Sequence, residues 1–446
     1  VNSNGRTYAS WTFRKAPKFF DVVTYTGTGT VQNISHNLGS VPGCIIVKET
    51  GASSDWQVYH RGLDSTAPED YVIELNRTDN RTNSASAWND TAPTSTHFTV
   101  GTKNATNGSN DSFVAYLFAH NNGDGGFGED GDQDIIKCGS YTGTGSAGNF
   151  IDLGFEPQWV LVKNSSGTGS WFLGDNMRGV ATGGNDAYLF ANASDAEATT
   201  NWVSFNSTGF TIDATGTQTN GNTYNYIYIA IRRGPMKTPE SGTEVFAIDY
   251  QTSTSTVPNF NSGFPVDMGI RKYNVSGIDE PALSTRLLGK SYLFTSETNA
   301  ENALSIVEFD HMDGWTLNKT TNAVSYMFRR SPGFFDVVAY DGTGSATTIN
   351  HNLGVAPELM IIKSRDATRN WAVYAGDETD YLVLNKTDSS TDNDNYWNDT
   401  APTSSVFTVG ADTVVNNSGE NYIAYLFATL PGVSKVGSYT GNGTSQ

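Results

Sequence analysis

Hydrophobic positions along this chain fall into short runs separated by clusters of Gly, Thr, Ser, Asn and Pro. In the run "NYIAYLFA" at residues 421–428, both alternating sets of side chains are largely apolar, which is typical of a strand in the middle of a sheet. No long stretch has the period of an amphipathic helix, and residues 195–200 and 300–309 leave room for at most a short one. The pattern predicts an all-β protein.

Two segments of the chain are near-copies of each other. One reads "FFDVVTYTGTGTVQNISHNLGSVPGCIIVK" from Phe19, and the other reads "FFDVVAYDGTGSATTINHNLGVAPELMIIK" from Phe334. Each is followed by the runs "WNDTAPTS", "FTVG" and "AYLFA" in the same order. We call this segment type A, and its recurrence predicts two copies of one domain.

Two more distant relatives lie between the type A segments. Type B opens with "CGSYTGTGSAGNFIDLGFEPQWVLVK" from Cys138, and type C opens with "VFAIDY" from Val245. Because each unit has about 100 residues and several short strands joined by turns, we expect a tandem array of antiparallel β-sandwich domains. The expected sandwiches cover residues 17–120 (type A), 135–237 (type B), 243–330 (type C) and 332–430 (type A).

Both ends of the chain match parts of these units. "YASWTFRKAPKFF" from Tyr8 matches "VSYMFRRSPGFF" from Val324, so residues 1–16 are expected to be the terminal strand of a preceding type C domain. "GSYTGNGTSQ" from Gly437 matches the opening of type B, so residues 436–446 are expected to be the first strands of a following type B domain. We expect both segments to pair with strands outside this chain, because a divided sandwich leaves unpaired strand edges.

Composition narrows the classes of function. The 446 residues include 9 Trp, 21 Tyr and 23 Phe, enough to build several cores. The formal net charge of −19 would repel a nucleic-acid backbone, so no DNA or RNA partner is expected. No apolar run approaches the roughly 18 residues that span a bilayer, so no membrane insertion is expected.

The repeated run "YTGTG" raises one candidate for cofactor binding. In type B it extends to Gly143-x-Gly145-x-x-Gly148, the spacing of a dinucleotide-binding loop. The type A copies lack the third Gly, and no helix is expected after any copy. We therefore interpret the run as a hairpin turn in which Gly supplies a positive φ, and we expect no organic cofactor.

Cysteine and histidine give no further candidate for catalysis. Cys44 and Cys138 stand where other units have apolar residues, so we expect buried thiols, and no disulfide between two different domains. His36 and His351 share "HNLG", but no nucleophile or carboxylate recurs at a spacing that would pair with them. The sequence predicts no enzyme.

A Gly- and Asp-rich segment at residues 121–134, "NNGDGGFGEDGDQD", interrupts the repeat. Asp124, Asp130, Asp132 and Asp134 are candidate ligands for Ca²⁺, which takes oxygen ligands from flexible acidic loops. The alternative interpretation is a solvated linker.

An aromatic residue opens each copy of "WNDTAPTS". Trp88 and Trp397 are candidates for contact with glycan. The alternative is that Asp90 and Asp399 hold an Asx-type turn after a structural Trp.

The runs "FRKAPKFFDVVTYTGTGTVQNISHNLGSVPGCIIVK", "AYLFAHNNGDGGFGEDG", "LGFEPQWVLVK", "DNMRGV" and "FRRSPGFFDVVAY" resemble the tandem domains of tail-fibre and virion structural proteins of marine tailed bacteriophages. The resemblance runs along nearly the whole chain in the same order of units. It implies a structural protein of the virion and suggests no catalytic residues. Phage fibres are commonly homotrimers, so it also implies a homo-oligomer.

Three functions remain after the resemblance. The first is a non-enzymatic tail fibre in the phage virion, acting as an extended spacer that contacts other virion proteins and a host-surface glycan or protein. The second is an extracellular microbial filament in which neighbouring subunits complete each other by strand addition. The third is a glycan-degrading tailspike, which would need carboxylates grouped in one unit.

Overall fold

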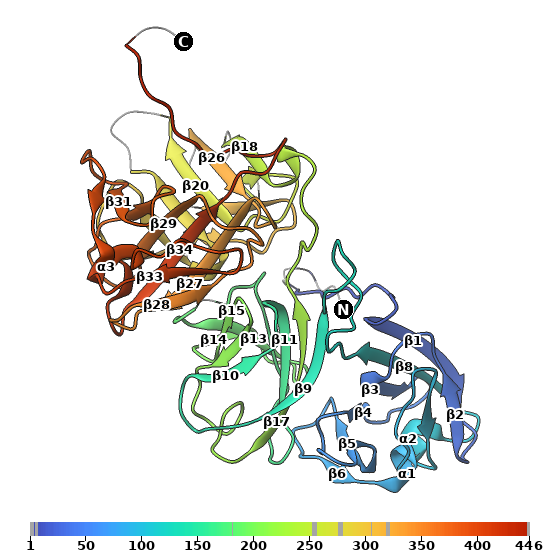
Figure 1. Ribbon diagram of the computed structural model, residues 1–446. Helices are drawn as coiled ribbons and strands as arrows, with labels where there is room; N and C mark the ends of the chain where they lie inside the picture. Colours follow the sequence, from blue (N-terminus) through green and yellow to red (C-terminus); the bar gives the residue numbers. More distant parts are fainter. Residues whose placement is uncertain are drawn as a thin grey trace.

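The computed structural model describes residues 4, 8–180, 182–251, 257–274, 280–304, 306–317 and 322–443. It contains four consecutive units, which we name A1, B, C and A2 in chain order (Figure 1). In each unit a six-stranded antiparallel sheet packs against a small sheet of two or three strands. The predicted all-β fold with repeated sandwich-like domains is confirmed. In the part of the chain that the structure describes, no helix is both long and apolar enough to cross a membrane.

Unit A1 has its six-stranded sheet in the order β1-β8-β3-β4-β5-β6, and β2 pairs with β7 in the small sheet. Its strands are β1 (Phe20–Thr26), β2 (Gln32–Ser35), β3 (Pro42–Glu49), β4 (Gln57–His60), β5 (Tyr71–Glu74), β6 (Thr82–Asn83), β7 (His97–Val100) and β8 (Ser112–Ala119). Its short helices are η1 (Pro68–Asp70), α1 (Ala85–Trp88) and α2 (Asn104–Asn107).

Unit B repeats this order as β9-β17-β11-β12-β13-β14, and its small sheet has the order β10-β16-β15. Its strands are β9 (Ile136–Thr142), β10 (Asn149–Asp152), β11 (Pro157–Asn164), β12 (Phe172–Asp175), β13 (Asp186–Phe190), β14 (Ala198–Thr200), β15 (Val203–Asn206), β16 (Gly209–Ile212) and β17 (Asn225–Arg232).

Unit C has the order β18-β26-β20-β21-β22-β23, with a small sheet β19-β25-β24. Its strands are β18 (Phe246–Gln251), β19 (Phe260–Asn261), β20 (Met268–Tyr273), β21 (Ala282–Thr285), β22 (Ser291–Phe294), β23 (Asn302–Ala303), β24 (Val307–Glu308), β25 (Gly314–Leu317) and β26 (Ala323–Phe328). Its short helices are η2 (Gly242–Glu244) and η3 (Arg286–Leu288).

Unit A2 has the order β27-β34-β29-β30-β31-β32, with β28 paired to β33. Its strands are β27 (Phe335–Asp341), β28 (Thr347–Asn350), β29 (Leu359–Ser364), β30 (Ala372–Tyr374), β31 (Asp380–Val383), β32 (Thr391–Asp392), β33 (Val406–Val409) and β34 (Asn421–Phe427). Its helices are α3 (Asp394–Trp397) and α4 (Thr413–Asn416), which match α1 and α2 of A1. The segments 195–200 and 300–309, which left room for at most a short helix, contain the strands β14, β23 and β24.

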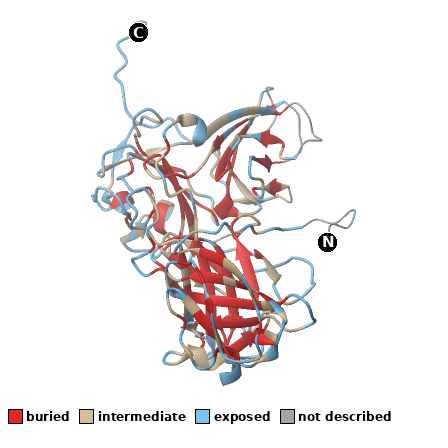
Figure 2. Cartoon of the chain, turned by 90° about the vertical axis from the view of Figure 1, so that its right-hand side faces the viewer, coloured by how far each residue is buried: buried red, intermediate tan, exposed pale blue. Residues whose placement is uncertain are grey.

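In units A1, B and A2, the closing strand and the third strand of the large sheet are largely buried on both faces. In β11 of unit B, Val160 and Val162 face the small sheet of the same unit, while Leu161 faces away from it. The outward set belongs to a hydrophobic cluster shared by A1 and B, and a second shared cluster joins C to A2. The four units therefore form two pairs, A1–B and C–A2, each built by packing the outer faces of two large sheets. Figure 2 shows the buried residues concentrated in these sheets.

Both pairs use the same contacts. In the A1–B pair, the Arg81 amide donates to the carbonyl of Ser165 (3.0 Å), and the Gly169 amide donates to the carbonyl of Thr78 (2.8 Å). The indole of Trp171 donates to the carbonyl of Glu74 (3.0 Å). Through these bonds, a loop of unit B and its Trp171 pack against A1 at β5 and the residues that follow β5.

The C–A2 pair repeats these bonds between residues at the equivalent positions of its two units. The Glu301 amide donates to the carbonyl of Arg365 (2.8 Å), and the Arg369 amide donates to the carbonyl of Thr298 (2.9 Å). The Trp371 indole donates to the carbonyl of Phe294 (3.1 Å). The two pairs are therefore two copies of one arrangement.

The terminal segments form no strand in the residues that the structure describes. Residues 8–15 have no sheet partner, although Trp11 and Phe13 are half-buried against the A1–B cluster. Residues 437–443 are exposed, and residues 436–443 also form no strand. That these segments pair with strands of other units stays a prediction.

The shared Trp position gives a test of the pairing. Trp171 and Trp371 are buried at the pair interfaces, whereas Trp56 holds the equivalent place in A1 and is only half-buried. We expect Trp171→Ala and Trp371→Ala each to lower the free energy of unfolding by about 3–5 kcal/mol, because each leaves a cavity and an unpaired carbonyl. Trp56→Ala is the matched control and should cost clearly less in urea denaturation. Equal losses for all three variants would contradict the assignment of the two interfaces.

Candidate functional site

The two tryptophans proposed for glycan contact lie inside the units. Trp88 is 2% exposed and Trp397 is fully buried, and their indoles donate to the carbonyls of Tyr71 (3.1 Å) and Asp380 (3.0 Å). Neither ring has a face available to a sugar. We therefore withdraw the expectation of glycan contact for both residues, and the turns after them hold structural aromatic side chains.

The acidic segment between A1 and B does not gather its four carboxylates. The Asp134 carboxylate accepts hydrogen bonds from the amides of Gly123 (2.8 Å) and Gly125 (3.1 Å), and so closes the loop on itself. Asp124, Asp130 and Asp132 are exposed. Within the described ranges these residues form no cluster of metal-ligand spacing, and Ca²⁺ binding by this segment stays a prediction.

Another group of metal-ligand spacing lies in unit C. His311 Nε2 is 3.8 Å from a Glu308 carboxylate oxygen and 3.5 Å from an Asp310 carboxylate oxygen. Asp310 is exposed, so its charge is solvated without an ion. Spacing alone does not make these three side chains a metal site.

The histidines of "HNLG" have identical structural roles. His36 Nδ1 accepts from the Leu38 amide, and His351 Nδ1 accepts from the Leu353 amide, both at 3.2 Å. Burial lowers the pKa of each ring, so both are neutral links within a turn.

The two cysteines are free and buried, as expected. They nevertheless lie close together, because A1 and B pack at this point: a Cβ placed on Gly43 would lie 2.7 Å from the Cβ of Cys138. Burial raises the pKa of the Cys44 and Cys138 thiols, so neither is a ready nucleophile.

The repeated Gly turn is held from inside by a buried asparagine. Asn107 accepts from the Thr28 amide (2.9 Å) and donates to the Thr30 carbonyl (2.6 Å), while Gly29 has a φ of 71°. Asn220 and Asn416 bind the equivalent turns in the same way. These amides fill the turn, which supports a structural interpretation over a phosphate site. Sequence reasoning missed them, although each stands in an Asn-rich run shortly before the closing strand.

A buried ionic network at the junction of three units is the most concentrated chemistry in the described structure. Arg330, just after β26, donates through Nε to Asp336 (2.7 Å) and through Nη1 and Nη2 to the two oxygens of Glu156 (2.7 Å each). Its amide donates to Asp267 (2.8 Å). All four residues are buried. Arg330 therefore links unit B, through Glu156, to units C and A2.

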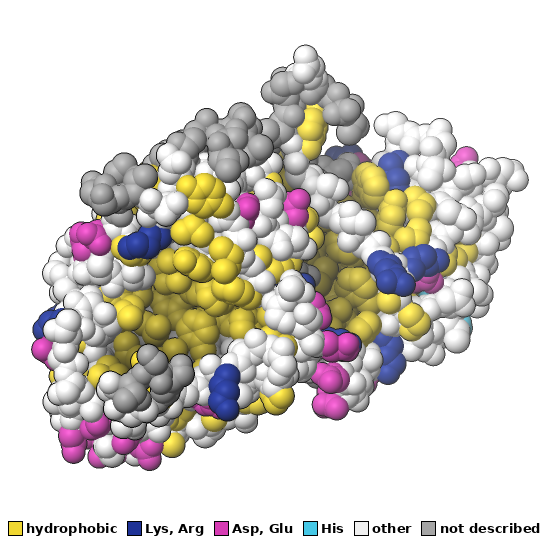
Figure 3. Space-filling model, turned by 90° about the horizontal axis from the view of Figure 1, so that it is seen from above, with side chains coloured by type: hydrophobic (Ala, Val, Ile, Leu, Met, Phe, Trp, Pro, Cys, Tyr) yellow, Lys and Arg dark blue, Asp and Glu magenta, His cyan; other side chains and the backbone are white. Residues whose placement is uncertain are grey.

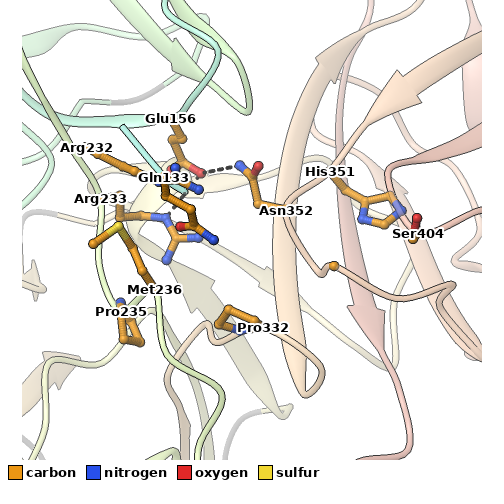
Figure 4. Close-up of a pocket in the computed structure, with 11 residues that line it drawn as sticks. Gln133, Glu156, Arg232, Arg233, Pro235, Met236, Pro332, His351, Asn352 and Ser404 are labelled. Carbon is orange, nitrogen blue, oxygen red and sulfur yellow. Dashed lines mark hydrogen bonds and ion pairs between the residues drawn. The ribbon is translucent and has the colours of Figure 1, made fainter. Parts of the chain in front are cut away.

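A second arginine and an asparagine complete the network. Arg233 Nε lies 3.2 Å from Glu156. The Asn352 amide donates to Asp336 (2.7 Å), and the Asn352 side chain donates to the carbonyl of Ser207 (3.0 Å). Figure 4 shows Glu156, Arg233 and Asn352 converging from opposite sides of the junction. The A1–B pair and the C–A2 pair are thus joined by buried ion pairs and hydrogen bonds.

The same junction holds a cleft of about 210 Å³. It is lined by Gln133, Glu156, Arg232, Arg233, Pro235, Met236, Pro332, His351, Asn352, Gly354 and Ser404 (Figure 4). Of the charged groups that line it, Glu156 and Arg233 pair with each other, and Arg232 Nη1 donates to the carbonyl of Asp134 (3.2 Å). Its geometry serves to join units.

The charges of the network support one another. Burial alone would raise the pKa of Asp336, but the positive charges of Arg330 and Arg233 outweigh burial and hold it below its usual value. A carboxyl with a lowered pKa stabilises the fold above its usual pKa, and this contribution is lost as the pH falls through the lowered value. The junction is therefore expected to persist at mildly acidic pH.

A buried histidine marks the A1–B interface. His60 Nε2 lies 3.0 Å from the carbonyl of Tyr228, and its Nδ1 accepts from the Gly62 amide (3.0 Å), which places the ring proton on Nε2. Burial lowers its pKa to about 3. Thr285 holds the equivalent place in unit C, so the C–A2 interface has no titrating group at this position.

The Arg330 network can be tested against its counterpart in A1. Lys15 occupies the matching position and pairs with Asp21 (2.7 Å), but its side chain is 60% exposed. We expect Arg330→Met to lower the free energy of unfolding by about 3–5 kcal/mol, because the carboxylates of Glu156 and Asp336 stay buried without its guanidinium. Lys15→Met should cost about 0–1 kcal/mol. Chemical denaturation of both variants measures the difference, and comparable losses would show that the network does not join the units.

His60 predicts that acid weakens the A1–B pair selectively. Because its folded pKa lies below the usual 6.5, its stabilising contribution is complete above pH 6.5 and declines as the pH falls toward 3. The expected slope is about 1.4 kcal/mol per pH unit. His60→Gln keeps both hydrogen-bonding functions without titrating and should flatten the pH dependence of urea unfolding between pH 4.5 and 7. An unchanged slope would show that His60 is not protonated on unfolding.

Comparison with known proteins places the chain in one family. The model of a family described as a domain of unknown function (DUF7483) matches residues 1–235 and 321–446. Both matched segments begin with residues that resemble the last strand of type C and continue into a type A unit. No curated protein matches the chain, and no solved structure matches it. Because the two matches together span well over half of the 446 residues, the chain belongs to the DUF7483 family.

Proposed function

We propose that this chain is a non-enzymatic structural segment of a tail fibre in a phage virion. In this role it serves as an extended spacer and contributes to attachment at the host surface. The resemblance of its units to tail-fibre proteins motivates the assignment to a virion. The architecture supports a mechanical role, because paired sandwiches joined by buried contacts resist bending.

The observation that carries the proposal is the recurrence of one inter-unit contact set in both pairs. Trp171 and Trp371 make the same bond to a carbonyl of the preceding unit, and the flanking main-chain bonds recur with them. The histidines, buried asparagines and glycines that repeat in the sequence likewise serve turns and cores. Repetition here preserves a way of stacking units, as expected for a fibre.

Partners follow from this role. Other virion proteins and further copies of the chain would extend the fibre, and a host-surface glycan or protein would bind exposed loops. Each such contact is expected to be weak and to gain strength from many copies. The net charge of −19 favours solubility of a long exposed particle and disfavours nucleic acid as a partner.

Immunogold electron microscopy with an antibody against the purified chain tests the proposal. We expect label along the tail fibres of virions in a lysate of the source. Label on cell-surface filaments of uninfected cells, with none on virions, would instead identify the extracellular filament. A glycan-cleavage assay on the same protein should show no turnover. Cleavage abolished by a single Asp or Glu substitution would replace the structural function with a tailspike enzyme.

A further inference from the structure

The outer face of each large sheet has two halves with different partners. We call the outer-face side chains on the first and last strands the leading half, and those on the fourth and fifth strands the trailing half. In the A1–B pair, Val58 and Ile73 of the trailing half of A1 and Cys138 of the leading half of B are completely buried. In the C–A2 pair, the trailing half of C covers the leading half of A2 in the same way.

In the leading half of unit C, Phe328 packs against A2, but the neighbouring outer-face side chains are not covered by any residue that the structure describes. Val337 and Tyr425 face each other across β27 and β34 in A2, and each is 1% exposed. Their counterparts in C, Ile248 and Tyr326, are 58% and 37% exposed. Tyr250 on the same face is 42% exposed. The equivalent positions in B and A2 are buried, so large apolar side chains exposed here indicate an interaction surface.

The trailing half of unit A2 is open as well. Leu382 is half-buried, and Leu384 is 46% exposed, whereas Ile73, the counterpart of Leu382 in A1, is completely buried beneath B. Seen from above, the C–A2 part of the molecule has a broad hollow lined by hydrophobic side chains (Figure 3). The pair thus has one open half on each of its two units.

The first pair shows what fits such a surface. Phe13 packs on Phe20 and Phe118 at the leading half of A1, with ring centroids 5.5 Å apart in each case. Trp11 donates to Asp175 at the end of β12, on the trailing half of B (2.9 Å). A single segment therefore touches the leading half of the first unit and the trailing half of the second.

This segment is the counterpart of a type C closing strand. In the alignment of residues 8–20 with residues 323–335, Trp11 stands at Tyr326 and Phe13 stands at Phe328. Phe328 packs on Phe335 (5.5 Å) and Phe427 (6.0 Å), as Phe13 does on their counterparts in A1. A segment that corresponds to part of a type C unit therefore packs against both A1 and B, as a third partner of this pair.

We infer that the C–A2 pair presents a seat for one type B sandwich, whose trailing half covers the leading half of C and whose leading half covers the trailing half of A2. Three units, one each of types C, A and B, then form a closed ring in which the outer faces of their large sheets pack against one another at the centre. The A1–B pair is the same ring with a type C strand in the third position. The order follows from the observed joints: C covers A, A covers B, and the Trp11 contact joins B to C.

The seat also has the main-chain groups that the joint requires. In the A1–B joint, Glu74, Thr78 and Arg81 supply a carbonyl, a carbonyl and an amide to unit B. Val383, Thr387 and Ser390 hold the equivalent positions in A2, and residues 386–390 are exposed. An incoming type B unit would meet these groups through its counterparts of Trp171, Gly169 and Ser165.

The test extends the chain with its own type B sequence. Residues 1–435 are followed by a second copy of residues 138–237, since Val436 aligns with Cys138. Hydroxyl-radical footprinting then compares the extended and original chains. Oxidation of Tyr250 and Tyr326 should fall about fivefold or more, because well-packed interface cores exclude water. Met312, which is 69% exposed in unit C and away from this face, should react equally in both proteins.

Two variants make the result decisive. Trp171→Ala in the added copy alone should restore oxidation of Tyr326, and so should Ile248→Asp in unit C. Unchanged oxidation of Tyr326 in an extended chain whose added unit is folded would overturn the inference. Tyr326 already protected in the original chain, with sedimentation showing a dimer, would overturn it in favour of a second copy as occupant.

If the added copy does not fold, the first pair offers a second test. Joining residues 236–322 to residue 8 restores a complete type C sequence ahead of A1. Oxidation of Trp56 and Tyr116, both half-buried now, should then fall, and unchanged rates would overturn the ring. The outcome is independent of whether the chain belongs to a virion, because it reports only how the units pack.

Discussion

The structure depends on one constraint: each six-stranded sheet is apolar on both faces. The small sheet of a unit covers the inner face, as it does over Val160 and Val162, but nothing within the unit covers Leu161 on the outer face. Burial of such side chains is worth roughly 1.5–3 kcal/mol each, so an outer face left in water would be a large loss. The need to cover this outer face explains why the units pair and why Trp171 and Trp371 insert between them. It also explains why the leading and trailing halves differ in exposure from one unit to another.

The joint between the two pairs is of a different chemical kind. Arg330 is fully enclosed and meets carboxylates from units B, C and A2, so its geometry is set by directional bonds at 2.7–2.8 Å. Such a network adds less to stability than its contacts suggest, because every charge in it has been removed from water. What it supplies is a defined orientation of one pair against the other. Lys15, at the corresponding position in A1, keeps its charge in solvent and pairs with Asp21.

Much of the fold could be predicted from the sequence because repeats reveal units, and Gly turns and apolar runs reveal strands. The buried cysteines followed from their replacement by apolar residues in other copies. The burial of Trp88 and Trp397 could not be predicted, because an aromatic side chain before an Asx turn can point either into the core or into solvent. The pairing of outer faces could not be predicted either. A strand that is apolar on both sides shows that both faces of its sheet are covered, but it does not identify what covers them. Arg330 gave only a weak signal, as one of two adjacent arginines.

The hydrogen bonds that flank the inserted Trp at each inter-unit joint are made by the main chain. Ser165 and Gly169 of unit B are replaced by Arg365 and Arg369 in A2, yet the same carbonyl and amide form the same bonds. At the positions that bond only through the main chain, these bonds do not depend on the identity of the side chain. Natural variation can therefore rewrite the loops around each joint, and with them whatever surface the particle shows to its surroundings, while the stacking of the sandwiches is inherited unchanged.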